Sequence, residues 1–183
     1  MIRWFVLVLS AGASEAVGQV MTFEGFAPPG GVVNVNPTTP YSEAGFTLTP
    51  SNSSSAVFDA AAAVDMPGNS NSSFFGWQGG NIITLTKSGG GTFALQSILL
   101  GPSTIAAGST SIALQGFLGG GGSVTLSPPS LSTATLAAPG WTNLTSVQFS
   151  ATTDSAMDNV TIPAPAGLAV LGLGGLLSAR RRR

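Results

Sequence analysis

Two runs of sequence decide the fold class: residues 91–101, GTFALQSILLG, and residues 110–119, TSIALQGFLG. In the first run the odd-numbered side chains from 93 to 97 alternate with the even-numbered ones, and in the second Ile112 and Leu114 alternate with small or polar residues. Alternation of this kind places successive side chains on opposite faces of a β-strand. Four consecutive glycines then lead into SVTLS, which is typical of a turn between antiparallel strands.

Outward from these runs, the chain consists of short β-rich segments separated by Gly, Pro, Asn and Ser. This pattern predicts an all-β domain over residues 19–161, an antiparallel β-sandwich of jelly-roll type. The helix candidate within it, residues 60–64, is expected as one turn in a loop. Strands are expected at 20–26, 32–35, 45–49, 56–58, 74–77, 82–87, 92–99, 111–118, 123–126, 145–151 and 157–162.

The composition excludes several classes of site. The 183 residues include no Cys and no His, so the usual Ser-His-Asp and Cys-His nucleophiles, disulfides, and zinc sites with nitrogen or sulfur ligands are excluded. Charged residues make up 7% of the chain, far below the ~25% of an ordinary soluble domain. We therefore expect no cofactor, except that oxygen ligands leave room for calcium.

The charges of the body also exclude a class of partner. Between residues 19 and 162 the one basic residue is Lys87. Binding to nucleic acid requires several Lys or Arg side chains on one face to displace counterions from phosphate. The sequence therefore predicts that nucleic acid is not a partner. The acidic residues of the same segment are Glu24, Glu43, Asp59, Asp65, Asp154 and Asp158.

Residues 1–18 have the pattern of a secretory signal peptide. Arg3 supplies a short positive region, WFVLVLS follows as a compact apolar core, and small residues come next. Cleavage is expected after Ala13, Ala16 or Gly18, with Gly18 first. The alternative for this segment is a buried first strand or a short core helix.

The carboxyl end, residues 162–183, reads IPAPAGLAVLGLGGLLSARRRR. Pro163 and Pro165 break any preceding strand, and residues 166–179 are then almost wholly apolar. As a helix these would span about 21 Å, short of a ~30 Å hydrocarbon core. The terminal arginines can snorkel to the headgroups and favour a cytoplasmic end. Both ends are then expected to start inside and the body to lie outside.

A Pro-x-Pro motif, a short Gly/Leu/Ala helix and a closing Arg run resemble the PEP-CTERM sorting signal of exported Gram-negative proteins. The usual Pro-Glu-Pro is Pro-Ala-Pro in this chain. The alternative is an ordinary carboxy-terminal tail anchor. The residues that carry the resemblance are Pro163, Pro165, Arg180, Arg181, Arg182 and Arg183.

The resemblance implies processing by an exosortase, an integral-membrane enzyme that cuts near the Pro motif. It implies a transient anchor in the cytoplasmic membrane through the carboxyl-terminal helix, and delivery of the body to the cell envelope or extracellular matrix. The strand-rich runs of the body, such as NIITLT at 81–86 and WTNLTSVQFS at 141–150, also resemble the β-sandwich bodies of that family.

One group of residues is a candidate metal site. In jelly rolls the first and last strands are often neighbours, which would bring Glu24 close to Asp158 and Asn159. Two carboxylates and an amide carbonyl are ligands that calcium accepts, with backbone carbonyls completing six to eight oxygens. The alternative is that these acids are solvated at strand ends.

The aromatic residues are candidates for ligand contact. Trp77 lies in a loop rich in Asn, Ser and Gly, and Trp141 follows Pro139 and Gly140. An aromatic ring can cover the apolar face of a sugar while amides meet its hydroxyls. Large aromatic residues are more often part of a core, and Phe75 and Trp77 would share one face of a strand.

Together these patterns predict an exported, non-catalytic protein of the cell envelope or extracellular matrix. The alternative is a carbohydrate-binding module for extracellular polysaccharide. Glycoside hydrolysis would need two carboxylates about 5–10 Å apart, and the sequence spacing singles out no such pair. The sequence therefore predicts that the protein is not an enzyme.

Overall fold

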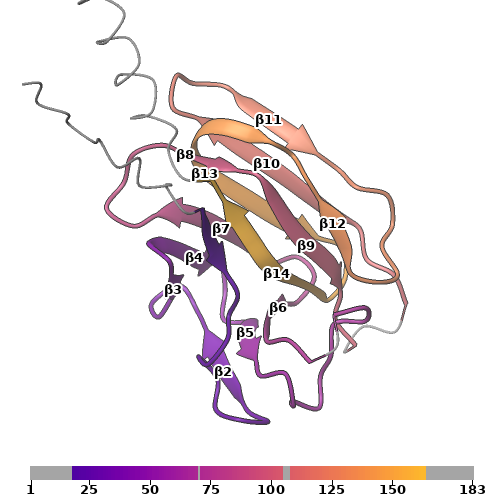
Figure 1. Cartoon of the computed structure of the whole chain (residues 1–183). Helices are drawn as coiled ribbons and strands as arrows, with labels where there is room; N and C mark the ends of the chain where they lie inside the picture. Colours follow the sequence, from indigo (N-terminus) through magenta and orange to yellow (C-terminus); the bar gives the residue numbers. More distant parts are fainter. Residues whose placement is uncertain (1–17, 70, 105–107, 164–183) are drawn as a thin grey trace, which may run out of the picture. The chain divides into compact units, whose positions relative to one another are not determined.

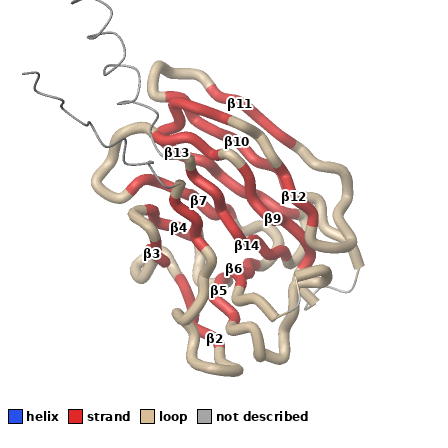
Figure 2. The backbone as a smooth tube through the Cα atoms, viewed as in Figure 1, coloured by secondary structure: helices blue, strands red, loops and turns tan. Residues whose placement is uncertain are grey.

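The computed structural model describes residues 18–69, 71–104 and 108–163. The expected signal peptide and the expected carboxyl-terminal sorting segment therefore lie almost wholly outside the described residues. Within the described residues every regular element is a β-strand (Figure 2). None of the described segments forms an apolar helix of the length that a membrane crossing requires.

The strands form two antiparallel sheets that face each other as two layers (Figure 1). The first sheet has the order β12-β9-β14-β6-β5-β2, with β1 also paired to β14, and the second has the order β11-β10-β13-β7-β4-β3, with β8 also paired to β13. The bounds in the first sheet are β1 Gln19–Met21, β2 Val32–Val35, β5 Ser55–Phe58, β6 Phe74–Trp77, β9 Ser97–Pro102, β12 Thr135–Ala137 and β14 Ser155–Ile162. The bounds in the second are β3 Tyr41–Glu43, β4 Phe46–Pro50, β7 Ile82–Lys87, β8 Phe93–Leu95, β10 Ile112–Leu118, β11 Ser123–Leu126 and β13 Trp141–Ala151. An all-β, sandwich-like fold is thus confirmed, and the jelly-roll connection stays a prediction.

The interior between the sheets is a single apolar cluster. It contains Phe75 and Met157 from the first sheet and Leu85, Leu114 and Phe149 from the second, all at most 1% exposed. Inward-facing residues alternate with polar ones along the second sheet, as the burial of β10 shows. Burial of these side chains away from water is the main favourable term for this fold.

The run expected as one strand at 92–99 is two strands in different sheets. β8 pairs with β13 in the second sheet, and β9 pairs with β14 and β12 in the first. The chain crosses between the sheets at Gln96, whose N–H donates to the carbonyl of Thr161. Buried positions are odd-numbered in β8 and even-numbered at the start of β9. The crossing shifts the alternation by one residue, so the single-strand prediction was wrong.

The strand expected at 20–26 ends at Met21, because the next residues turn. Phe23 has a φ of 63°, in the left-handed region that an extended strand does not use. The Glu43 carboxylate accepts the N–H groups of Thr22 and Phe23 at 3.0 Å and holds this turn. Short β1 nevertheless pairs with β14, with Gln19 opposite Ile162, so the first and last strands are neighbours as expected.

A second, smaller apolar cluster lies on the outer face of the first sheet. Its buried members are Ala56, Phe58, Met66, Phe74 and Ala156. Met66 belongs to the long connection between β5 and β6, and with Ala62 and Val64 of the same connection it packs on this face. β5 and β6 are therefore buried along their whole length, unlike strands of the second sheet.

Candidate functional site

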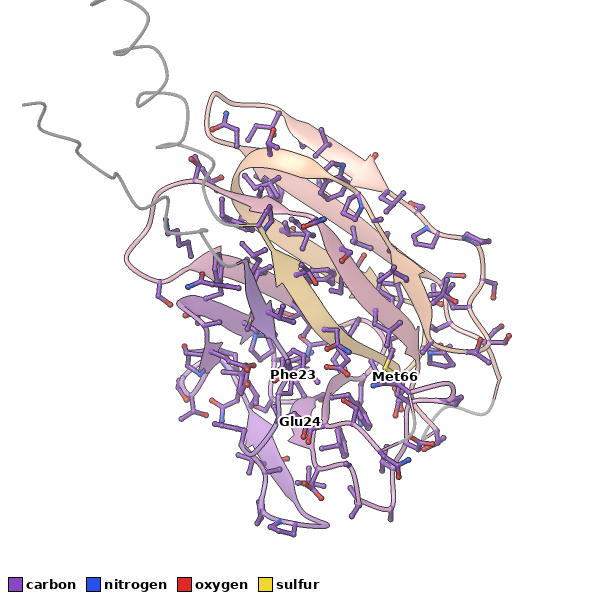
Figure 3. All side chains as sticks on the ribbon, in the orientation of Figure 1. Phe23, Glu24 and Met66 are labelled. Atoms are coloured by element: carbon purple, nitrogen blue, oxygen red, sulfur yellow. The ribbon has the colours of Figure 1, made fainter. Side chains whose placement is uncertain are left out.

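Three places bear on function: an acid pair near β14, the two tryptophans, and a groove across the outer face of the first sheet. The acid pair joins Glu24, on the turn after β1, to Asp158 in β14. The Ser72 hydroxyl lies 3.0 Å from Glu24 Oε1 and 2.8 Å from Asp158 Oδ2, and so bridges the two carboxylates. Figure 3 marks Glu24 beside Phe23 on this turn.

Each of these carboxylates is already surrounded by donors. The Ser73 N–H and hydroxyl donate to Glu24 at 2.9 and 3.0 Å. Asp158 accepts bonds from the amide of Asn69 at 2.9 Å and from both the backbone N–H and the side-chain amide of Asn159. Asn159 therefore acts as a donor toward Asp158, and its carbonyl is not placed as a ligand beside it.

Asp158 is fully buried, and this changes its acidity. Burial raises the pKa of the Asp158 carboxyl, and the nearby Glu24 charge adds to the rise, while the bonds from Asn69, Ser72 and Asn159 lower it. A carboxyl group with no exposed surface does not meet a substrate directly. Among the described residues no group of three or more acidic side chains is arranged to hold a metal ion. Calcium binding therefore stays a prediction.

A second carboxylate shapes the same turn. Glu43 accepts the hydroxyl of Tyr41 at 2.6 Å, and burial, followed by this bond and the Glu43 charge, raises the pKa of Tyr41. The Tyr41 ring packs 5.1 Å from Phe23 and 4.8 Å from Phe26. Phe26 is the aromatic ring with the largest described exposure, at 43%. The acid and the rings together fix the turn after β1 against both sheets.

The two tryptophans proposed as ligand contacts occupy core positions. Trp77 is 3% exposed and packs with Phe75 in the cluster between the sheets. Trp141 is partly buried against the same cluster, and its Cε3 would lie 2.9 Å from a Cβ added to Gly116. Trp77 therefore has the core role considered as the alternative for large aromatic residues, whereas Trp141 keeps part of its surface exposed.

Trp77 nevertheless carries an unusual polar atom. Its indole Nε1 is buried and has no hydrogen-bond partner among the described residues. The hydroxyls of its cross-strand neighbours are engaged elsewhere: Ser55 accepts from Asn81 at 2.7 Å, and Ser155 bonds to Thr110 at 2.6 Å. Leaving such a donor unpaired costs about 1–3 kcal/mol, so this position is a candidate for contact with a ligand or water.

The floor of the groove is one end of a row of short side chains that crosses five strands of the first sheet. Cross-strand pairing aligns Asn34 of β2, Ala56 of β5, Gly76 of β6, Ala156 of β14 and Gly101 of β9. Side chains this short leave a trough between the longer side chains of the adjacent rows. Over its Asn34–Gly76 end the trough is an open groove of about 250 Å³.

The two walls of the groove differ in chemistry. One wall is apolar, made by Val32 and Phe58, which are paired across β2 and β5. The opposite wall is polar and includes the carboxylate of Asp154, whose Oδ1 accepts the N–H of Gly79 at 3.2 Å. Trp77 also contributes to the lining. The polar lining comprises Asn34, Ser53, Ser54, Ser55, Gln78, Ser103 and Asp154.

Sequence pattern alone does not reveal this groove. Its floor depends on which residues pair across strands far apart in the chain, and neither Asn34 nor Gln78 stands out from the many other amides. One local signal was available: Gly76 interrupts the aromatic run FFGW. A glycine inside a strand often marks close approach of another group, here Phe58, whose Cε2 would lie 2.8 Å from an added Cβ.

Comparisons with known proteins give no family. No protein-family model matches the chain, and no curated protein matches it. One similar solved structure is the enzymatically active domain of tailspike protein 4 of bacteriophage CBA120, at 14% identity and a TM-score of 0.35. The match covers 66% of this chain and 19% of that chain, so this chain spans about a fifth of its length.

That neighbour contradicts the expectation that the chain is not an enzyme, because its description is of an enzymatically active domain. We therefore withdraw that expectation. A TM-score of 0.35 gives no ground for assigning the neighbour's activity to this chain.

Proposed function

We propose that the chain is an exported protein of the cell envelope or extracellular matrix whose β-sandwich body contacts neutral polysaccharide through the groove. The observation that carries the proposal is the chemistry of the groove walls. An apolar wall facing a wall of amides and hydroxyls matches a sugar, which has apolar C–H faces and hydroxyl edges. Ligand sites in general combine apolar lining with a few well-placed polar groups.

The charge of the body supports a neutral partner over a charged one. Lys87 is the one basic residue between 19 and 162, against six acidic ones. A polyanion would meet repulsion from this surface, and a polycation would find the acids spread over separate loops and strands. The jelly-roll assignment belongs to the same proposal, since sandwiches of that type occur in lectin domains.

Export and sorting are the second part of the proposal. The signal-like residues 1–18, the Pro163–Pro165 motif and the four terminal arginines support it. An exosortase would cut near the Pro motif after transient anchoring in the cytoplasmic membrane. The pairing of Gln19 with Ile162 brings the residues next to the two proposed cleavage points onto neighbouring strands.

Affinity electrophoresis of the full-length protein tests the polysaccharide contact. Gels containing galactomannan, dextran or xyloglucan are compared with an alginate gel and a gel without polymer. We expect retardation on at least one neutral gel and none on alginate. The double variant Asn34→Ala/Gln78→Ala removes two exposed amides of the groove and should weaken binding about tenfold, at about 0.5–1.5 kcal/mol per hydrogen bond.

The matched control is Gln96→Ala, which removes an exposed amide away from the groove and should leave retardation unchanged. Retardation that is equal in wild type and the double variant would show that the groove is not the site. Retardation of no protein on any neutral gel would refute the polysaccharide contact itself.

Mass spectrometry of the protein from its own host tests sorting. We expect mature molecules that lack residues 1–18 and end near Pro163, because both terminal segments are proposed to be removed. An intact peptide containing Arg180–Arg183 on most surface-exposed molecules would refute processing and favour a plain tail anchor.

A further inference from the structure

The outer face of the second sheet has a composition of its own. Its outward side chains form rows across the strands that contain no charged residue. One row joins Thr125, Gln115, Gln148, Thr84 and Thr49, which belong to β11, β10, β13, β7 and β4. Such a row presents hydroxyls and amides at the spacing of neighbouring strands, about 4.8 Å.

A hollow of about 240 Å³ lies over one end of this face. Gln115 and Gln148 are paired across β10 and β13 and contribute their amides to it, and Thr125 and Ser150 add hydroxyls. Ala113 and Ile82 give the hollow an apolar side, and Ile82 is 40% exposed. The hollow thus offers donors, acceptors and a small apolar surface without charge.

The polar side chains at the two ends of the face differ in how many hydrogen bonds they already make within the protein. At the β3–β4 end, the Thr47 hydroxyl lies 3.0 Å from both Ser42 and Ser88 hydroxyls. In the hollow, the Gln115 amide makes one long bond of 3.4 Å to Ser123, and Gln148 makes no side-chain bond to a described residue. The amides of the hollow are therefore available to a ligand.

We infer that this hollow is a second binding site for neutral polysaccharide, so that the body is bivalent and can bridge two chains. The inference rests on the proposed function. Amides and hydroxyls both donate and accept, as sugar hydroxyls do, and the absence of charge suits a neutral polymer. Protein interfaces instead use apolar cores with aromatic and Arg anchors, which this hollow lacks.

The two sites lie on opposite outer faces of the two-layer body. The groove is on the outer side of the first sheet and the hollow on the outer side of the second, with the apolar cluster between the sheets separating them. One polysaccharide chain in the groove therefore leaves the hollow open to another. Binding of two chains by one body would cross-link the polymer.

The test uses the full-length protein with galactomannan, dextran and xyloglucan in two measurements, gel retardation and light scattering on mixing. The hollow variant is Gln115→Ala/Gln148→Ala, and the groove variant is Asn34→Ala/Gln78→Ala. We expect wild type to scatter strongly at intermediate protein-to-polymer ratios. Each double variant should still be retarded, with binding weakened about fivefold or more, but should no longer raise scattering.

The control Thr86→Ala changes the same face outside the hollow and should behave as wild type. If the groove variant alone loses all retardation and the hollow variant matches wild type in both measurements, the second site is refuted while the proposed function stands. If wild type is not retarded on any neutral gel, the proposed polysaccharide contact is refuted, and the second binding site is refuted with it.

Discussion

The outer faces of the two sheets are built in opposite ways. On the first sheet, β5 and β6 are buried at every position because the connection between them covers the outer face with Met66. On the second sheet, β7 and β10 alternate between buried and more exposed residues, and the outer face is mostly Ser, Thr and Gln, with Ile82, Ala113 and Phe117 among them. The same two-layer fold therefore carries one covered outer face and one open one.

The difference between the two outer faces is visible in the sequences of the strands. SAVF and FFGW are continuous small or apolar runs, as in strands covered on both faces, whereas ITLTK and IALQG alternate, as in strands with one solvated face. The cover stops short of the Asn34 end of the small-residue row, and the groove lies there. The binding proposed at the first sheet thus depends on where the covering connection ends, and the binding proposed at the second sheet depends on the strands alone.

The largest expected difference between the faces comes from removing an aromatic ring on each. Phe74 is 1% exposed and stacks on Phe58 at 5.1 Å, so Phe74→Ala should lower the free energy of unfolding by about 3–5 kcal/mol. Phe117→Ala on the outer face of β10 should cost about 1 kcal/mol or less. Urea denaturation measures both, and equal losses would mean that the first sheet is not covered as described.

A smaller effect is expected from adding one methyl group to the floor of the groove. A Cβ on Gly76 would lie 2.8 Å from Phe58 Cε2, so Gly76→Ala should cost about 1–3 kcal/mol through overpacking. Gly120, in the turn before β11, has open space around its Cα, and Gly120→Ala is the matched control with little expected change. A Gly76→Ala protein as stable as the control would show that Phe58 does not close over the floor.

Local pattern predicted much of the fold. β2, β6, β7 and β11 were predicted with the bounds that they have, because their apolar and β-branched residues stand between clear turn signals. β3 and β12 were missed. Each has three residues and pairs with one neighbour. A strand this short gives too few alternating buried and exposed positions to be recognised from its sequence.

Features that depend on distant parts of the chain were beyond the sequence. The crossing at Gln96 leaves no local break, since alternation continues on either side of it with shifted phase. Glu24 and Asp158 were expected to be close because their strands are neighbours, but Ser72, which joins them, gave no signal in its Asn/Ser loop. The groove floor requires the register of three strands, β2, β5 and β6, at once.

The covered face should also respond to pH through Asp158. Its pKa is raised by burial, so the folded protein binds the proton more readily than the unfolded chain does. The stabilisation by this group is therefore complete below its unfolded pKa and is lost as pH rises through its folded pKa. We expect wild type to gain stability relative to Asp158→Asn as pH falls from 7 to about 4, the unfolded-state region.

Denaturant unfolding of both proteins across this pH range measures the difference, and the acids that do not interact with Asp158 cancel because both proteins contain them. A constant difference between wild type and Asp158→Asn at every pH would mean that Asp158 is solvated and that the connection between β5 and β6 does not cover it.

The smallest expected effect is that of calcium on the same acid pair. Glu24 and Asp158 already accept bonds from Ser72, Ser73, Asn69 and Asn159, and calcium would have to replace these donors with six to eight oxygens. If these donors stay in place, melting temperatures should agree between chelator and millimolar calcium. A real site would add about 2.7 kcal/mol at a hundredfold excess over its dissociation constant. A rise in melting temperature that Glu24→Gln abolishes, and that Asp59→Asn on an exposed loop leaves intact, would place calcium at the pair and show that the donors around it rearrange.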